Sequence, residues 1–367
     1  MPVRWLVFDL GGVVVDFDPD AAWVPYARQS PQREAAICAL VTDPEGPRAR
    51  LSEGRISAAE YFAAVDGALG KPLSLSAHKA IDVAVLRGER PGMAALLGAL
   101  DGTARLACCS NTHDLHWRHM LATYPCMARF EVQLASHLMG VRKPAPEAYE
   151  ITCQRLGARP EECVFIDDGR ENVEAARRVG MVGIHFESPA RLVETLGELG
   201  LPVAPTADGR IARRRAVRAL MLTPAGEVLL MRAQEPASGR EVWFAPGGGM
   251  DGDETPEACL RRELAEETGR GDLEIGPVLW TRRHTFDWDH RILTQEETYR
   301  LVRTPRFEPV MAANPSPAEA AAFREFRWWT ADRIAASDAL FAPRRLAELV
   351  RDLMASGPPG EPFDSGV

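Results

Sequence analysis

The stretch that decides the fold of the second half of the chain is Gly248–Gly269, which reads GGMDGDETPEACLRRELAEETG. Its second part predicts a helix. Thr255 is a suitable N-cap, Pro256 takes the first helical position, and Gly269 follows the last one. Because both ends of the helix are specified locally, the sequence also indicates which of its side chains share a face.

Three glutamates, Glu263, Glu266 and Glu267, lie at spacing i, i+3 and i+4 on this helix, so we expect their carboxylates to converge on one patch. Like charges at this spacing cost roughly 0.2–0.5 kcal/mol per pair, and the helix dipole disfavours anions in the last turn. A bound divalent cation removes both costs, and oxygen ligands suit Mg²⁺ or Mn²⁺, which also bind phosphate oxygens. A solvated acidic face is the alternative interpretation.

The spacing around these glutamates resembles the Nudix box, G-x5-E-x7-R-E-U-x-E-E-x-G-U, in which U is an aliphatic residue. Gly248, Glu254 and the run Arg262–Gly269 match the pattern, and only Arg270 departs from it. This departure concerns packing just after the helix and none of the acidic residues. The second half of the chain therefore resembles the Nudix hydrolases, which implies an α+β domain with a mixed sheet.

The resemblance implies that Glu263, Glu266 and Glu267 bind the metal, and that Glu266 or Glu267 helps to activate the attacking water. It also implies that Glu254 and Arg262 brace the loop against the helix. The glycines before the helix allow backbone N–H groups to approach a diphosphate, although they fit a tight turn equally well. The candidate substrate-binding residues of this half are Gly247, Gly248 and Arg262.

Length and composition favour two domains. The chain has 367 residues, of which 46% are hydrophobic, enough for two sizeable cores. Its formal net charge of −9 argues against a nucleic-acid partner. The sequence is compatible with a homo-oligomer.

Cysteine usage and hydropathy favour a cytoplasmic protein. The seven cysteines show no paired spacing, and Cys108–Cys109 lie in an apolar run, so we expect buried free thiols in a reducing compartment. The apolar run Val3–Val15 is interrupted by Asp9 and two glycines, and no run approaches the roughly 20 apolar residues of a membrane span. We therefore expect no signal peptide and no membrane partner.

In the first half, three apolar runs end in polar residues. The runs predict strands, and helical patterns intervene between them, so we expect a parallel sheet. Because ligands bind beyond the carboxyl ends of parallel strands, the residues that follow the runs should meet at one rim. The runs are Val3–Phe8, Arg105–Cys109 and Cys163–Ile166, and the residues that follow them are Asp9, Ser110, Asn111, Asp167 and Asp168.

Lys143 is a further candidate residue of this site. Pro144 biases its backbone toward an extended conformation. Its ammonium could then reach a phosphate as a point charge. Taken singly, Asp9 could be a strand-end cap, Ser110 an N-cap and Lys143 a solvated side chain. The adjacent pair Asp167–Asp168 is harder to explain as structure, because the two carboxylates repel each other without a cation.

Together, these features resemble the haloacid dehalogenase superfamily across roughly residues 1–200. Phe8–Val13 resembles its first motif, Ser110–Asn111 its second, Lys143–Pro144 its third and Asp167–Asp168 its fourth. The resemblance implies a Rossmann-like parallel-sheet domain that dephosphorylates a small phosphate monoester with the help of Mg²⁺.

The resemblance also implies roles for single residues. Asp9 would be the nucleophile that forms an aspartyl phosphate. Ser110 and Lys143 would hold the phosphoryl group, with Asn111 beside them at the substrate. The implied metal site consists of the carboxylates of Asp9 and Asp168 and the backbone carbonyl of Gly11, with Asp167 and Asn172 around it.

One position departs from the phosphatase pattern. Phosphatases of this superfamily usually carry a second Asp two places after the nucleophile, as a general acid and base worth about 10²–10⁴-fold in rate. Gly11 takes that place here, as in some phosphatase-like members; Asp16 or a water is a candidate substitute. Dehalogenases also lack this Asp, but their reaction needs no Mg²⁺, and the pair Asp167–Asp168 therefore argues against dehalogenation.

The remaining segments complete the predicted layout. Residues 16–90 are expected to be mostly helical, and the resemblance implies that they form a cap that limits substrates to small phosphorylated metabolites. Residues 201–209 contain two prolines and a glycine and predict a linker. Residues 210–355 form the predicted second domain, and residues 356–367 a loose tail.

We therefore predict a bifunctional hydrolase with Mg²⁺, or alternatively Mn²⁺, at both sites. The Nudix-like half would cleave a nucleoside-diphosphate-linked pyrophosphate, and the first half would dephosphorylate a small phosphate monoester. In the alternative, only the Nudix-like site is catalytic, and the first half, weakened at Gly11, binds a metabolite or dimerises. A third hypothesis is a nucleotide-sensing regulator without turnover.

Overall fold

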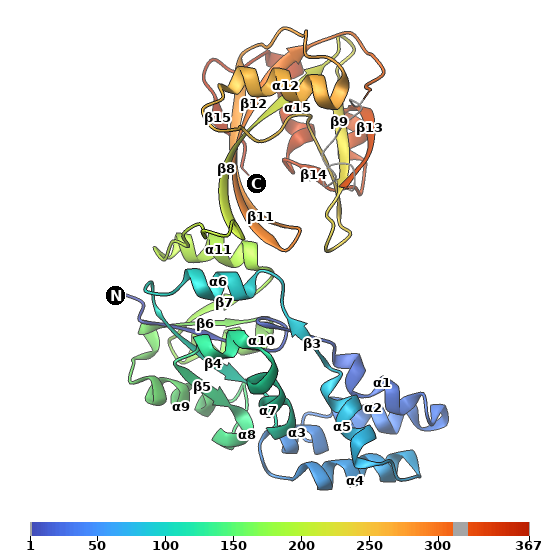
Figure 1. Ribbon diagram of the computed structural model, residues 1–367, viewed down its shortest axis with the longest axis vertical. Helices are drawn as coiled ribbons and strands as arrows, with labels where there is room; N and C mark the ends of the chain where they lie inside the picture. The colour runs from blue at the N-terminus through green and yellow to red at the C-terminus, as the bar shows by residue number, and fades with distance from the viewer. Residues whose placement is uncertain (1, 311–321, 367) are drawn as a thin grey trace. The chain divides into compact units, whose positions relative to one another are not determined.

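The computed structural model describes residues 2–310 and 322–366 of the chain. The chain divides into two compact units, Met1–Ala204 and Pro205–Val367. Each unit has its own sheet and its own hydrophobic core (Figure 1).

The first unit is built on a parallel sheet with strand order β5-β4-β1-β6-β7. All four residues of β1 are buried, and Phe8 pairs with Cys108 on one side and with Ile166 on the other. A strand without polar alternation is typical of a position that is covered on both faces. The prediction of a parallel α/β sheet is therefore confirmed, with these strands: β1 (Trp5–Phe8), β4 (Arg105–Ser110), β5 (Val132–Ala135), β6 (Cys163–Asp167) and β7 (Val182–His185).

Helices cover both faces of this sheet (Figure 1). On one face, Tyr149 and Cys153 of α9 and Ala176 of α10 share a core with Val7 and Phe165 of the strands. On the other face, α6 lies beside α11. The elements that complete this part are α6 (Met93–Ala99), α7 (Asp114–Thr123), η3 (Pro125–Arg129), α8 (Ser136–Met139), α9 (Pro146–Leu156), η4 (Pro160–Glu162), α10 (Arg170–Arg178) and α11 (Pro189–Glu198).

Between the short strands β2 and β3 the chain is helical and has a small core of its own, which includes Tyr26, Ile37 and Tyr61. One of its helices, α4, begins with a capping box at Ser57. The Ser57 hydroxyl accepts the N–H of Glu60, and the Glu60 carboxylate accepts the N–H of Ser57. The elements are β2 (Val15–Phe17), η1 (Pro19–Ala22), α1 (Val24–Ala27), η2 (Pro31–Arg33), α2 (Glu34–Thr42), α3 (Pro47–Ser52), α4 (Ala58–Leu69), α5 (Leu75–Val83) and β3 (Leu86–Glu89).

The second unit is built on a mixed sheet with strand order β14-β10-β9-β8-β12-β11-β15, and β13 also pairs with β9. β8 and β9 form a hairpin, in which Leu222 opposes Val228. Along β8, Val217 belongs to the core that includes α12, whereas Leu220 belongs to the core that includes α15. The elements are β8 (Ile211–Leu222), β9 (Glu227–Gln234), β10 (Glu241–Phe244), α12 (Pro256–Thr268), β11 (Val278–Trp288), β12 (Arg291–Arg303), β13 (Phe323–Thr330), α14 (Ala331–Ala335), β14 (Phe341–Ala342), α15 (Leu346–Ser356) and β15 (Phe363–Asp364).

Two short strands, β14 and β15, follow β13 along the chain. Phe341 extends the sheet at β10, and Phe363 extends it at β11. The segment expected to be a loose tail thus carries an edge strand. Two-residue strands are too short to show a period in the sequence, so only their pairing partners define them.

The hydropathy of the helices and the state of the cysteines agree with the sequence. Within the described ranges, no helix is long and apolar enough to cross a bilayer. The cysteines are free, and Cys108 and Cys109 are buried as predicted. Buried thiols behave as small apolar side chains, so these two contribute to packing.

The buried position of β1 predicts how truncation of its side chains changes stability. Leu6→Ala should lower the free energy of unfolding of the first unit by about 2–5 kcal/mol, because lost burial and the remaining cavity add to each other. Urea titration followed by circular dichroism measures this. Leu138→Ala is the control, since Leu138 is 69% exposed and its truncation should change stability by less than about 0.5 kcal/mol. Equal effects of the two substitutions would contradict this placement of β1.

Candidate active sites

The first site lies at the carboxyl ends of three adjacent strands. Asp9 directly follows β1, Ser110 is the last residue of β4, and Asp167 is the last residue of β6. Because β1 pairs with both β4 and β6, these ends are neighbours. Asp9, Asp167 and Asp168 each bring a carboxylate oxygen within 4.8 Å of the other two.

Lys143 lies within this group of carboxylates. Its side chain is 1% exposed, and Nζ lies 2.6 Å from Oδ2 of Asp167 and 3.0 Å from Oδ1 of Asp9. Burial favours the neutral amine, but the two carboxylates outweigh it and raise the pKa of Lys143. Asn111 fixes the Lys143 backbone, because its amide donates to the Lys143 carbonyl at 2.8 Å and accepts the Lys143 N–H at 2.9 Å. Asn111 is therefore a positioning residue for the lysine in this structure.

The aspartates differ in their surroundings. Oδ1 of Asp167 accepts the N–H of Gly169 at 2.8 Å and the amide of Asn172 at 2.9 Å, so both its oxygens have partners. Burial raises the pKa of Asp9 to about 7, with Lys143 opposing and Asp167 adding to the shift. Burial and then Asp167 also raise the pKa of Asp168. One lysine thus balances only part of the acidic charge, and an oxygen-only cluster of this kind fits a divalent cation such as Mg²⁺.

Two glycines follow Asp9 in this loop. Gly12 has φ +79°, and a Cβ on it would lie 2.0 Å from Oδ2 of Asp168, so a side chain is excluded there. Gly11 stands where related phosphatases carry an aspartate. Its candidate substitute, Asp16, lies in β2 and pairs with Arg90 at 3.1 Å. The Asp16 carboxylate is therefore engaged elsewhere in this structure.

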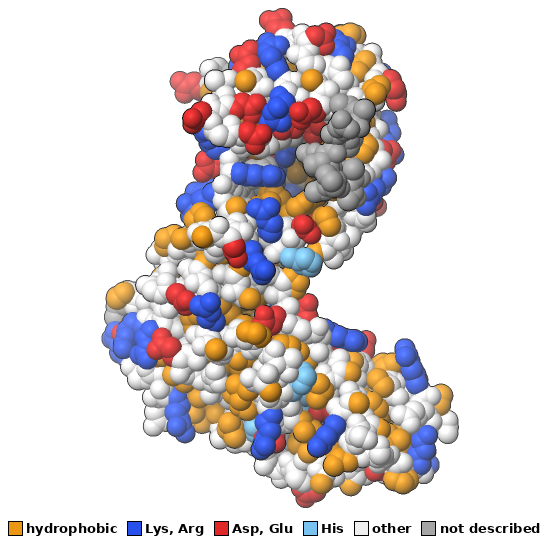
Figure 2. Space-filling view, viewed as in Figure 1, with side chains coloured by type: hydrophobic (Ala, Val, Ile, Leu, Met, Phe, Trp, Pro, Cys, Tyr) orange, Lys and Arg blue, Asp and Glu red, His pale blue; other side chains and the backbone are white. Residues whose placement is uncertain are grey.

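The second site lies on α12, over which acidic and basic side chains lie side by side (Figure 2). The N-cap at Thr255 and the left-handed Gly269 bound this helix as predicted. Arg262 links the helix to the preceding loop. It donates to both carboxylate oxygens of Glu254 at 3.1 Å, to Glu263 at 2.8 Å and to Glu266 at 3.3 Å.

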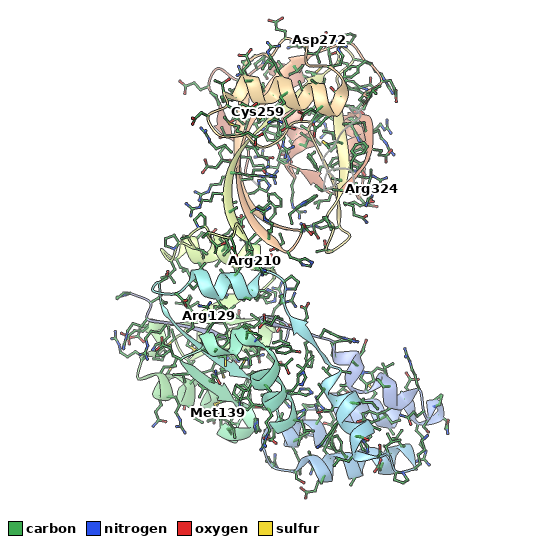
Figure 3. The ribbon with its side chains drawn as sticks, viewed as in Figure 1. Arg129, Met139, Arg210, Cys259, Asp272 and Arg324 are labelled. Atoms are coloured by element: carbon green, nitrogen blue, oxygen red, sulfur yellow. The ribbon has the colours of Figure 1, made fainter. Side chains whose placement is uncertain are left out.

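The glycine turn before α12 packs closely against the helix. Gly247 N–H donates to Oε2 of Glu267 at 2.7 Å. A Cβ on Gly248 would lie 2.3 Å from Oε1 of Glu263. Cys259, labelled in Figure 3, places its Sγ 3.4 Å from the Gly249 carbonyl oxygen. The turn therefore needs its glycine at 248 and presents its backbone beside two of the predicted metal ligands.

The three glutamates of α12 do not converge as the sequence predicts. Among the described residues, their carboxylate oxygens do not all come within 4.8 Å of one another. The reason is that Glu267 turns to Gly247, whereas Arg262 holds Glu263 and Glu266. Burial raises the pKa of Glu263, against the opposing effect of Arg262.

Comparison with protein families gives two matches along the chain. A family model described as haloacid dehalogenase-like hydrolase matches residues 3–180, and a NUDIX domain model matches residues 212–352. A haloacid dehalogenase-like domain is followed by a NUDIX domain. Both are families of hydrolases that act on phosphate esters or anhydrides.

Individual relatives are similar to parts of this chain. Flavin mononucleotide hydrolase 1 of Arabidopsis thaliana is 42% identical over 69 residues, which are 19% of this chain and 28% of that protein. D-ribitol-5-phosphate phosphatase of Bacteroides thetaiotaomicron is 23% identical over 199 residues, 51% of this chain and 94% of that protein. A solved HAD-like hydrolase of Porphyromonas gingivalis is 25% identical, covers 54% of this chain and 98% of its own, and has a TM-score of 0.48.

The NUDIX domain also holds a buried charge network that the sequence analysis missed. Glu297 on β12 is 3% exposed and accepts hydrogen bonds from Arg218 at 2.9 Å and from Arg282 at 3.1 Å. Gln295 and Tyr299 donate to it as well, at 2.7 Å and 3.1 Å. Burial alone would raise its pKa, but Arg218 and the other cations outweigh burial and hold the pKa of Glu297 at about 2.

Arg218 connects this network to the candidate site, because its guanidinium also donates to the Gly247 carbonyl. The sequence gives only a weak indication of this network. Polar residues alternate on β12 at Gln295 and Glu297, but their partners come from β8 and β11, and only the register of the sheet brings them together. A second group that the sequence analysis missed is Asp82, His113 and His116 in the first domain.

The charge network around Glu297 predicts that the stability of the NUDIX domain depends on pH. The folded-state pKa of Glu297 lies below its ordinary value of 4.5, so its ion pairs stabilise the NUDIX domain above pH 4.5, and this stability is lost as the pH falls toward 2. Glu297→Gln should cost about 3–5 kcal/mol at pH 7, because it leaves buried cations unpaired, and much less at pH 3. Urea unfolding at both pH values measures this. The control is Glu296→Gln, whose side chain is exposed next to it on β12; a pH-independent cost for Glu297→Gln would contradict the assignment.

Proposed function

We propose that this chain is a bifunctional, metal-dependent hydrolase. The haloacid dehalogenase-like domain dephosphorylates a small phosphate monoester through an aspartyl phosphate, and the NUDIX domain cleaves a nucleoside-diphosphate-linked pyrophosphate. The observation that carries the proposal is the cluster of Asp9, Lys143, Asp167 and Asp168 at the strand ends. Asp9 and Asp167 are buried and Asp168 is exposed, and so many carboxylates on one rim repel one another unless a cation offsets their charge.

In the first reaction, a carboxylate oxygen of Asp9 attacks phosphorus, and the bond to the leaving alcohol breaks. Water then attacks the aspartyl phosphate, which releases inorganic phosphate and restores the Asp9 carboxylate. We infer that Lys143 and Ser110 hold the phosphoryl oxygens. Mg²⁺, held by Asp9, Asp168 and the carbonyl of Gly11, would neutralise charge on the phosphoryl group.

The leaving alcohol needs a proton, and Gly11 offers none. The Asp16 carboxylate pairs with Arg90, so a water is the remaining proton source among the candidates from the sequence. We therefore expect the monoesterase to be slow compared with enzymes that carry an aspartate at this place, by about 10²–10⁴-fold.

In the second reaction, Glu266 or Glu267 accepts a proton from the water that attacks the diphosphate. We infer that the turn at Gly247 and Gly248 and the Arg262 guanidinium bind the diphosphate oxygens, which requires the Gly247 N–H to leave Glu267. Mg²⁺ or Mn²⁺, held by Glu263, Glu266 and Glu267, would stabilise charge on the transferring group. For this, Arg262 must turn from Glu263 and Glu266 toward the substrate.

The two reactions fit in sequence, because cleavage of a nucleotide-type diphosphate yields phosphate monoesters. Two relatives are named a flavin mononucleotide hydrolase and a ribitol-5-phosphate phosphatase, and both names describe enzymes that act on small phosphate monoesters. Flavin mononucleotide and ribitol 5-phosphate therefore belong in the substrate panel, together with diphosphates such as ADP-ribose.

Gly11 favours a second candidate function. If the missing acid abolishes turnover, the first domain binds a phosphorylated metabolite or dimerises, and only the NUDIX domain is catalytic. Wild-type protein without monoesterase activity, but with diphosphate hydrolysis, would support this alternative.

Two variants test the bifunctional proposal. Asp9→Asn removes the nucleophile and should lower hydrolysis of p-nitrophenyl phosphate by about 10³-fold or more, with diphosphate hydrolysis unchanged. Glu267→Gln should lower diphosphate hydrolysis by about 10²–10⁴-fold, with p-nitrophenyl phosphate hydrolysis unchanged. Each variant is the control for the other, with Mg²⁺ or Mn²⁺ present. Loss of both activities in either variant would contradict two independent sites.

The glycine turn offers a closer test of the NUDIX site. Gly248→Ala forces the Glu263 carboxylate to move, since the new Cβ would lie 2.3 Å from it, whereas a Cβ on Gly249 meets its nearest atom at 3.8 Å. We expect Gly248→Ala to lower kcat for diphosphates by about tenfold or more, because a displacement of about 1 Å is costly in catalysis. Gly249→Ala, the matched control, should keep at least half of the activity; equal losses would argue against this role of Glu263.

A further inference from the structure

A second cluster of metal-ligating side chains lies in the first domain, separate from the three aspartates. It consists of Asp82, near the end of α5, His113, which directly precedes α7, and His116 in the first turn of α7. All three residues are at most 4% exposed. This Asp82–His113–His116 cluster has no part in either proposed reaction.

The spacing of its atoms suits one small ion. Oδ2 of Asp82 lies 3.5 Å from Nε2 of His113 and 3.5 Å from Nε2 of His116. In a tetrahedral zinc site, ligand atoms at about 2.0–2.2 Å from the ion lie about 3.3–3.6 Å from one another. The two distances from Asp82 match that spacing, and one ligand atom from each of the three residues lies within 4.8 Å of the others.

Hydrogen bonding gives an independent indication. Among the described residues, neither ring nitrogen of His113 has a hydrogen-bond partner, and neither does Oδ2 of Asp82. Buried polar atoms without a partner are uncommon in folded proteins and destabilise them. Since Nε2 of His113 and Oδ2 of Asp82 face each other, one cation between them would satisfy both.

Arg48 is a charged neighbour of the cluster, and its positive charge opposes a further cation there. Arg48 on α3 pairs with Oδ1 of Asp82 at 2.5 Å and leaves Oδ2 to the histidines. Nε2 of His116 also lies 2.8 Å from the Asp82 carbonyl oxygen, so metal binding would replace this hydrogen bond.

We propose that Asp82, His113 and His116 bind a transition-metal ion, with Zn²⁺ as the best match. Two imidazoles with one carboxylate suit Zn²⁺, whereas Mg²⁺ prefers oxygen ligands only. The three side chains leave a fourth position for a water. Because α5 belongs to the helical segment between β2 and β3, and α7 follows the strand that carries Ser110, the ion would fasten this segment to the sheet domain.

Cobalt spectroscopy tests the coordination. The full chain is stripped of metal with a chelator and titrated with Co²⁺ in excess Mg²⁺, which occupies carboxylate-only sites. Four-coordinate Co²⁺ absorbs visible light much more strongly than six-coordinate Co²⁺, so we expect strong absorption at one equivalent. His113→Phe and His116→Gln should abolish it. His119→Phe, a matched control on the same helix and outside the cluster, should keep it.

Thermal unfolding gives a second readout that does not depend on activity. Zn²⁺ at a hundredfold excess over its Kd should raise the midpoint of the first domain by about 5–10 °C in the wild type and in His119→Phe. His113→Phe should show no such rise, and it should fold without metal because it removes two unpaired buried nitrogens. Weak wild-type absorption, or the same absorption and the same rise in His113→Phe, would overturn the proposal.

Discussion

One buried ammonium organises the first domain. Lys143 pairs with Asp9, which follows β1, and with Asp167, which ends β6. Without it, three carboxylates at adjacent strand ends would face one another with little compensating charge. Asn111 holds the lysine backbone in place, so a loop before α9 is tied to the end of β4. The site therefore depends on a balance of charge that residues from separate segments supply together.

In the NUDIX domain, arginines pair with the acidic side chains. Arg262 satisfies Glu263 and Glu266, and Arg218 satisfies the buried Glu297. The two arrangements meet at Gly247, whose N–H donates to Glu267 and whose carbonyl accepts from Arg218. Both polar groups of one glycine are thus fixed, which gives the turn before α12 a defined position beside the helix.

In both domains, basic side chains of the protein offset part of the charge of the acidic groups at the candidate site. Asp9 and Glu263 both have raised pKa values because burial disfavours their charged forms. Such sites gain stability from a divalent ion and from a phosphate that brings its own charge and geometry. This supports hydrolysis of phosphate esters and anhydrides more than a purely structural role.

The sequence by itself determined what is local. The caps of α12, the apolar run of β1 and the order of the motifs depend on neighbouring residues, so period and spacing were sufficient to predict them. The tertiary structure alone decided what depends on register and on distant partners. The burial of Glu297, the two-residue strands and the approach of Asp82 to His113 all join segments that sequence spacing does not relate. Which of several nearby charges a side chain pairs with depends on where the fold has placed those charges. This is why the glutamates of α12 turn to different partners.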